Sequence, residues 1–239
     1  YTWRNLFYEL SQNYRVIVLD LPGHGYSDRP VNFNYTVEEM GETIRMFMDA
    51  MGIESAHFVG FSLGYAYVLD FARKYPERTG KLVLLAPGGM VPEMPLAVRM
   101  IDSALFGFLA CRLYGIRTVE SILSECFFDL TTLNADVVTE YYRPASDIEA
   151  RKAIRLSLHN FDDENVIANL RSMDQPVLIL WGNEDKWRKS NSDSADMLHA
   201  ALHRSSASVI RNAGHLMHEE RAEKVIAAIL EYITVIVRN

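Results

Sequence analysis

Short apolar runs alternate along this chain with stretches in which apolar residues recur at spacings of three and four. Nearly continuous apolar runs predict strands that are buried on both faces, as in a parallel sheet. The predicted strands are residues 14–20, 55–61, 81–86, 176–181 and 207–213. The helical spacing covers residues 37–51, 63–75, 192–202 and 220–233. This alternation predicts an α/β fold with a doubly wound, mostly parallel sheet.

Residues 90–169 break the alternation, because they show no convincing strand pattern. They are rich in Met, Phe, Tyr and Leu at helical spacing, which predicts an inserted helical cap. A cap that closes over a sheet edge lines the cavity beneath it, so we expect an apolar pocket there. The predicted domains are thus an α/β core of residues 1–89 and 170–239 and a helical cap of residues 90–169.

The composition is that of one large soluble domain. The 239 residues are 49% hydrophobic and 23% charged, and the net charge of −7 argues against nucleic acid as a partner. Cys111 and Cys126 are too few for a disulfide framework or a zinc site and favour a cytoplasmic protein with reduced thiols. No apolar run reaches the length of a membrane span. Because the chain starts at Tyr1 and not at Met, the sequence leaves open whether a targeting segment precedes it. The oligomeric state is also left open.

One five-residue motif, Gly60-Phe61-Ser62-Leu63-Gly64, lies between a predicted strand and a predicted helix. A serine at such a corner adopts a strained backbone conformation that exposes its hydroxyl, and the flanking glycines relieve the crowding. The motif alone is common by chance. Its place between a strand and a helix, however, makes Ser62 a candidate nucleophile.

A serine nucleophile needs a base within hydrogen-bond reach and a carboxylate that orients the base. His215 follows the last predicted strand, and Asp185 follows the strand before it. The carboxyl ends of parallel strands meet at one edge of a sheet, so Ser62, Asp185 and His215 are expected to converge there. A single loop histidine is usually solvated, and a single loop aspartate usually forms a turn. The three together, in this order, predict a catalytic triad.

Two competing interpretations use other acidic residues. The run Asp162-Asp163-Glu164 is expected to be a solvated helix start and is a weaker candidate for the acid of the triad. His215, His218 and Glu219 lie on one loop with no partner cluster elsewhere, so we predict neither a metal nor another cofactor. Glu219 or Glu220 is instead expected to begin the last helix, where a carboxylate suits the helix dipole.

Together these motifs resemble the α/β-hydrolase fold family, in the branch with a serine nucleophile and a helical cap. The loop Asp20-Leu21-Pro22-Gly23-His24-Gly25-Tyr26-Ser27-Asp28 is similar to the family's D-x-x-G-x-G-x-S loop. The likeness covers nearly the whole chain. It implies that the backbone N–H of Leu63 stabilises the oxyanion. We also expect Phe61, Met90 and Leu216 to line the substrate pocket.

The chain departs from the family pattern at three points. Lys186-Trp187-Arg188-Lys189 follows Asp185 where the family often has a proline, and Tyr65 occupies a position where a small residue is frequent. The family's sheet also begins with three strands that have no counterpart here, one of them between the predicted strands 14–20 and 55–61. We therefore expect that this chain is a fragment of a longer protein and that it lacks the N-terminal strands. We also expect that strands 14–20 and 55–61 do not pair and that the chain is inactive without its second oxyanion donor.

The expected activity is hydrolysis of a small apolar carboxylic ester, lactone or thioester through an acyl-enzyme. The alternative is hydrolysis of a carbon–carbon bond, because Ala86-Pro87-Gly88-Gly89-Met90 resembles ring-cleavage product hydrolases. Those enzymes usually carry an aromatic residue directly after the catalytic histidine, whereas this chain has Leu216. Cofactor-free perhydrolysis is a further alternative. A receptor that uses the same fold to bind a ligand with little turnover is another.

Overall fold

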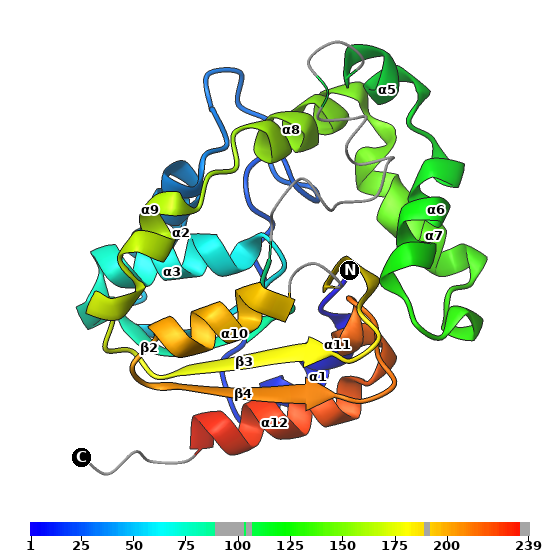
Figure 1. Ribbon diagram of the computed structural model, residues 1–239. Helices are drawn as coiled ribbons and strands as arrows, with labels where there is room; N and C mark the ends of the chain where they lie inside the picture. Colours follow the sequence, from blue (N-terminus) through cyan, green and yellow to red (C-terminus); the bar gives the residue numbers. More distant parts are fainter. Residues whose placement is uncertain (89–102, 104–106, 189–191, 235–239) are drawn as a thin grey trace.

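Four parallel strands form one sheet (Figure 1) in the part of the chain that the computed structural model describes, which is residues 1–88, 103, 107–188 and 192–234. The strands are β1 (Ala56–Phe61), β2 (Thr79–Leu85), β3 (Val177–Gly182) and β4 (Ser205–Ile210). They lie side by side in chain order, all parallel. The predictions of an α/β fold and of these four strands are confirmed, and the four carboxyl ends meet at one edge of the sheet.

Helices cover both faces of this sheet. On one face lie α2 (Val37–Ala50), α3 (Gly64–Lys74) and α10 (Ser192–Ala201), and on the other lie α1 (Arg4–Ser11) and α12 (Ala222–Thr234). The central strands supply both layers because side chains alternate along a strand. In β2, for example, Leu84 packs in the layer of α2 and α3, whereas Val83 packs in the layer of α1 and α12. The sheet is doubly wound, as predicted.

The helix α2 shows how local sequence sets these elements. The side chain of Thr36 accepts a hydrogen bond from the Glu39 N–H at 3.2 Å and so caps the first turn. Met40 and Met48 lie on the buried stripe of the helix. Gly52, at φ +64°, follows the end of the helix in the left-handed conformation that favours glycine.

The prediction of a strand at residues 14–20 is wrong. This segment has no regular secondary structure, and 41% of Ile17 and 42% of Val18 are exposed. A strand needs a neighbour that pairs with its backbone N–H and C=O groups. Among the described residues, no strand pairs with this segment, and β1 pairs with β2 alone. The expectation that segments 14–20 and 55–61 do not pair with each other therefore agrees with the structure.

The described part of residues 90–169 is helical and contains no strand. It holds α5 (Gly107–Leu113), α6 (Ile116–Cys126), α7 (Ala135–Tyr142), α8 (Ile148–His159) and α9 (Glu164–Ala168). We call residues 107–169 the helical insert. Figure 1 shows α8 on the far side of α3 from β3 and β4, and α6 and α7 at the right of the view, beyond the carboxyl ends of these strands. Met90 lies outside the described residues.

Short elements complete the chain. They are α11 (Met217–Glu220) and the 3₁₀ turns Pro76–Arg78, Leu130–Thr132, Arg143–Ser146, Leu170–Ser172 and Lys186–Arg188. Cys111 and Cys126 are both buried free thiols. Among the described helices, none has the length and apolar character that crossing a membrane requires.

Candidate active site

Ser62 lies at the corner between β1 and α3 in a strained conformation. Its φ is +50°, in the left-handed region, and its N–H donates to the carbonyl oxygen of Leu85 at 3.0 Å. A Cβ added at Gly60 would lie 2.7 Å from the carbonyl oxygen of Gly64, whereas one added at Gly64 would meet nothing within 4 Å. Relief of crowding at this corner is therefore the role of Gly60, and the prediction that both glycines serve it is wrong for Gly64.

The imidazole of His215 connects Ser62 with Asp185. Its Nε2 lies 3.1 Å from Ser62 Oγ, and its Nδ1 lies 2.8 Å from Asp185 Oδ2. An ionised carboxylate only accepts hydrogen bonds, so Nδ1–H donates to Asp185 and the Nε2 lone pair accepts from the Ser62 hydroxyl. Asp185 and His215 are both buried. The structure thus brings the three predicted residues together, and the predicted contact between Asp185 and His215 is present.

Two loops at the strand ends hold the acid and the base side by side. The N–H of Glu184 donates to the carbonyl oxygen of Ala213 at 3.0 Å. A Cβ added at Gly182 would overlap the carbonyl oxygens of Ala213 and Gly214. Glycine at position 182 therefore permits the close approach that brings Asp185 to His215.

Two aromatic rings contact the imidazole of His215. The Phe61 ring lies 5.0 Å away between centroids, and the Trp187 ring lies 4.7 Å away. Asp185 also accepts a hydrogen bond at Oδ1 from the backbone N–H of Trp187, at 3.0 Å. The sequence pointed to Phe61 as a pocket residue and to Trp187 only as a departure from the family pattern. An aromatic residue two positions after the candidate acid was the available signal for Trp187.

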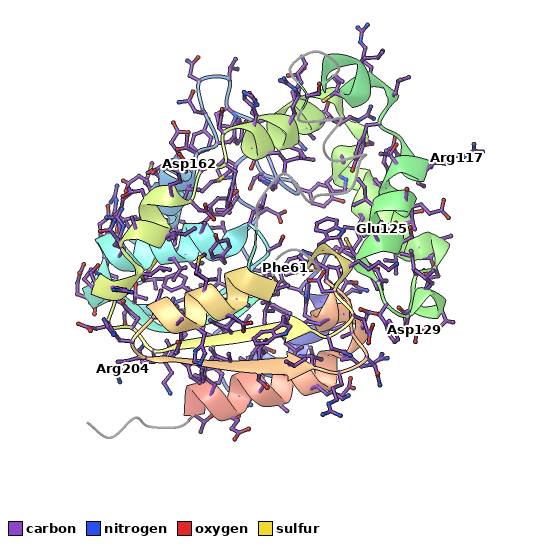
Figure 2. The ribbon with its side chains drawn as sticks, viewed as in Figure 1. Phe61, Arg117, Glu125, Asp129, Asp162 and Arg204 are labelled. Atoms are coloured by element: carbon purple, nitrogen blue, oxygen red, sulfur yellow. The ribbon has the colours of Figure 1, made fainter. Side chains whose placement is uncertain are left out.

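The acidic run at the start of α9 does not supply the acid. Asp163 is only 8% exposed, and its carboxylate accepts a hydrogen bond from the Tyr65 hydroxyl. Figure 2 shows Asp162 well away from Phe61. The expectation of a solvated helix start is therefore wrong for Asp163, because its carboxylate is buried and paired with Tyr65, the residue directly after Gly64. Burial, together with the Asp163 charge, raises the pKa of Tyr65.

The other predicted site residues differ in how the structure places them. Leu63 occupies the N-cap position of α3, so its N–H is one of the amides that lie free at a helix N-terminus. Leu216 is buried in a cluster with residues of the insert, including Phe127 and Val137. Their roles as oxyanion donor and pocket residue stay predictions.

Glu220 lies at the end of α11 and not at the start of the last helix, which begins at Ala222. It is buried, and its carboxylate accepts hydrogen bonds from the backbone N–H groups of Gly214, Phe128 and Asp129. Glu219 is also at the end of α11, so the expectation that one of these acids begins the final helix is wrong. The sequence does not reveal that Glu220 is buried, because two of its partners, the backbone amides of Phe128 and Asp129, are more than 90 residues away in the chain.

Glu219 and His218 join a second buried network behind Phe61. The Glu219 carboxylate pairs with Arg4 at 2.7 Å and accepts from the hydroxyl of Tyr141 on α7. His218 Nε2 lies 2.7 Å from Thr2 Oγ1, and its ring packs on Phe61 at 4.5 Å. Burial, together with the charges of His215 and Arg4, lowers the pKa of His218 to about 3.

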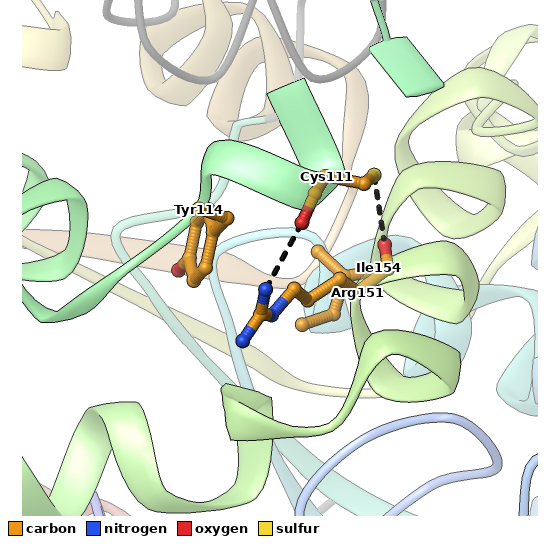
Figure 3. Close-up of a pocket in the computed structure, with 4 residues that line it drawn as sticks. All are labelled: Cys111, Tyr114, Arg151 and Ile154. Atoms are coloured by element: carbon orange, nitrogen blue, oxygen red, sulfur yellow. Dashed lines mark hydrogen bonds between the residues drawn. The ribbon is translucent and has the colours of Figure 1, made fainter. Parts of the chain in front are cut away.

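A small cavity lies inside the insert (Figure 3). Cys111, Tyr114, Arg151 and Ile154 line it. The Arg151 guanidinium donates to the Cys111 carbonyl oxygen at 3.1 Å and to the Ser146 carbonyl oxygen at 2.6 Å. Burial raises the pKa of the Cys111 thiol, which disfavours the reactive thiolate. The contact between Arg151 and Cys111 fastens α5 to α8.

No group of three or more His, Cys, Asp or Glu side chains among the described residues is placed to hold a metal ion. The site itself offers a hydroxyl bonded to an imidazole, and the imidazole bonded to a carboxylate. This arrangement can activate the hydroxyl as a nucleophile.

Comparison with known proteins gives matches over nearly the whole chain. A family model described as alpha/beta hydrolase fold matches residues 1–222. A 2-hydroxy-6-oxononadienedioate/2-hydroxy-6-oxononatrienedioate hydrolase of Comamonas testosteroni is 29% identical over 240 residues, which are 97% of this chain and 81% of that protein. Among solved structures, the 2-hydroxy-6-oxo-6-phenylhexa-2,4-dienoate hydrolase of Rhodococcus sp. strain RHA1 has a TM-score of 0.82 at 21% identity, over 98% of this chain and 85% of that one. A thermophilic esterase of Thermogutta terrifontis has a TM-score of 0.75 at 22% identity, over 97% and 84%. At these identities the two structures are similar to this chain in fold.

Proposed function

The chain belongs to the α/β-hydrolase fold family, as the resemblance implied, and we propose that it hydrolyses its substrate through Ser62, His215 and Asp185. The observation that carries this proposal is the continuous pair of hydrogen bonds from Ser62 Oγ to His215 Nε2 and from His215 Nδ1 to Asp185 Oδ2. A hydroxyl, an imidazole and a carboxylate in this order form a serine triad.

The proposal gives each residue a role. Ser62 Oγ attacks the substrate carbonyl while its proton passes to His215 Nε2. The negative charge that develops on the carbonyl oxygen is stabilised by the Leu63 N–H at the N-terminus of α3. His215 then returns the proton to the leaving group, and Asp185 holds the ring in the required tautomer. A water molecule, deprotonated by His215, releases the acyl group from Ser62.

The substrate class best supported is a vinylogous diketone acid of the kind produced by ring cleavage. The support is the 29% identical Comamonas testosteroni hydrolase, which is named for 2-hydroxy-6-oxononadienedioate and 2-hydroxy-6-oxononatrienedioate. In this reaction Ser62 attacks the ketone carbon, and the carbon–carbon bond to the conjugated chain breaks. The bonding electron pair is delocalised into that chain, which takes up one proton, and water converts the acyl-enzyme into a carboxylic acid.

Ester hydrolysis is the second candidate, and Leu216 favours it. The position after His215 is usually aromatic in ring-cleavage product hydrolases, whereas Leu216 is buried against Phe127 and Val137 of the insert. Attack on an ester uses the same three residues and needs no conjugated leaving group. We further propose that residues 90–169 form the cap and residues 1–89 and 170–239 the core, with an apolar substrate bound between them.

Steady-state kinetics can separate these activities. The experiment compares kcat/KM of the full-length protein for 2-hydroxy-6-oxo-6-phenylhexa-2,4-dienoate with its kcat/KM for a series of 4-nitrophenyl esters. The expected result is faster turnover of the dienoate, and loss of both activities by several orders of magnitude in Ser62→Ala. Faster ester turnover would select the second candidate. Activity of Ser62→Ala within tenfold of the parent would overturn the proposal, and a single burst without turnover would indicate a receptor.

A further inference from the structure

Glu220 is a buried carboxylate that has no part in the reaction described above. It lies five residues after His215 and is 7% exposed. Buried carboxylates are costly unless their oxygens are hydrogen-bonded. Glu220 meets this requirement with the backbone amides of Gly214, six residues before it, and of Phe128 and Asp129, more than 90 residues before it.

Its first partner is the residue next to the candidate base. Glu220 Oε2 accepts a hydrogen bond from the Gly214 N–H at 2.6 Å. The Glu220 N–H in turn donates to the carbonyl oxygen of Leu216 at 3.2 Å. Residues 214 and 216, on either side of His215, are therefore both bonded to Glu220.

Its other partners belong to the insert. Glu220 Oε1 accepts from the N–H groups of Phe128 at 2.9 Å and Asp129 at 2.8 Å, just after α6. The loop that carries His215 also lies directly against the residues at the end of α6, since a Cβ added at Gly214 would overlap the carbonyl oxygen of Cys126. The Leu216 N–H donates to the same carbonyl at 3.3 Å. One carboxylate thus fastens the loop of His215 to the insert.

We propose that Glu220 is a positioning residue that holds the imidazole of His215 between Ser62 and Asp185. Its carboxylate acts through the backbone N–H of Gly214, next to His215, and does not touch the reacting atoms. The inference rests on the proposed function, because it assigns His215 the role of base. Hydrogen bonds from N–H groups to a carboxylate are roughly twice as strong as those between neutral groups. Displacement of a catalytic group by about 1 Å can cost on the order of 10²-fold in rate.

Glu220→Gln tests the proposal, because glutamine has nearly the same size but presents an NH₂ in place of one oxygen. That NH₂ faces either the Gly214 N–H or the N–H groups of Phe128 and Asp129, so one side of the bridge is lost. Glu219→Gln is the matched control: it changes the neighbouring buried acid, which bonds to Arg4 and Tyr141 instead. Two measurements are made on each variant, namely kcat with KM, and the downfield proton resonance of the Nδ1–H between His215 and Asp185. Asp185→Asn assigns this resonance.

The expected result for Glu220→Gln is a fall in kcat of about 10- to 100-fold with little change in KM, and a broadened or missing resonance. Glu219→Gln is expected to keep the resonance and to keep kcat within about threefold, although its melting temperature falls. A parental kcat and resonance in Glu220→Gln would overturn the inference, as would equal losses in Glu219→Gln. The resonance needs no substrate, so it reports on Glu220 even where Ser62→Ala contradicts the proposed function.

A second variant covers the case in which Glu220→Gln does not fold. Glu220→Asp keeps the carboxylate but shortens its reach, so it can hold only one of the two segments. We expect a smaller fall in kcat than for glutamine, together with a weakened resonance. A folded Glu220→Asp protein with both measurements unchanged would contradict the inference.

Discussion

The indole ring of Trp187 lies 4.7 Å from the imidazole of His215, centroid to centroid, and their planes are inclined by 32°. The backbone N–H of the same residue donates to Asp185 at 3.0 Å. Trp187 therefore contacts both the candidate base through its side chain and the candidate acid through its backbone. An aromatic face next to an imidazole limits rotation of that ring, and it attracts the imidazolium that forms when the ring takes up a proton.

Trp187→Leu is expected to lower kcat by about 3- to 30-fold, which corresponds to the loss of a ring contact of roughly 0.5–2 kcal/mol. Trp187→Phe keeps an aromatic face and should retain most of the activity. The backbone bond to Asp185 is present in both variants, so the comparison isolates the ring. Equal kcat values for the leucine variant and the parent would show that the ring contact has no effect on the reaction.

Asp185→Asn should lower kcat by about 10⁴-fold, because an asparagine can stabilise the wrong imidazole tautomer. Asp163→Asn is the control, since Asp163 is also a buried aspartate but bonds to Tyr65. It should keep kcat within about tenfold. Steady-state kinetics on both variants checks the assignment, and a larger loss in Asp163→Asn would reverse it.

Tyr65→Phe is expected to lower the free energy of unfolding by about 1–3 kcal/mol, because it leaves the buried Asp163 carboxylate without its hydroxyl donor. The neighbouring Tyr67→Phe removes a hydroxyl that lies 3.3 Å from Ser157, a neutral partner. Its cost should be below that of Tyr65→Phe. Urea unfolding of the two variants measures the difference, and the reverse order would contradict this explanation.

The buried His218 should make the protein less stable in mild acid. Its pKa is lowered to about 3 in the folded protein from 6.5, so the unfolded chain takes up a proton that the folded protein does not. The free energy of unfolding therefore falls as the pH drops from 6.5 towards 3, by about 1.4 kcal/mol per pH unit at most. At pH 5 this contribution is about 2 kcal/mol.

Urea unfolding at pH 7.5, 6 and 5 measures this dependence. His218→Gln should flatten the slope relative to the parent, even where it lowers stability at pH 7.5. The exposed His203 is the control, and His203→Gln should leave the slope unchanged. A parental slope in His218→Gln would mean that other groups cause the loss of stability in acid.

Much of the core could be predicted from the sequence, because its strands carry their own signal. In β3 all six residues are buried, so a nearly continuous apolar run marks the strand without knowledge of its neighbours. The corner at Ser62 was predictable for a similar reason, since its glycine and its place between strand and helix are local features. Asp185 and His215 followed because the ends of parallel strands meet at one edge.

The failures concern residues whose structure depends on distant partners. Residues 14–20 have an apolar pattern, yet a strand also requires a paired neighbour, and an apolar pattern does not report one. Asp163 and Glu220 were expected on the surface or at a helix start, because acidic residues are rarely buried. Their burial depends on Tyr65 and on the amides of Phe128 and Asp129, which only the folded chain brings near.

The parallel pairing of the strands has a consequence for how the protein acquires activity as it folds. Ser62 and His215 are 153 residues apart in the chain, and Asp185 and His215 are 30 apart, so no short segment contains the site. Parallel strands pair only after long crossovers have closed, and such non-local contacts form slowly. Reaction of Ser62 with a fluorophosphonate during refolding should therefore lag behind the appearance of helical circular dichroism. The nucleophile would then serve as a kinetic marker for the completion of the tertiary structure.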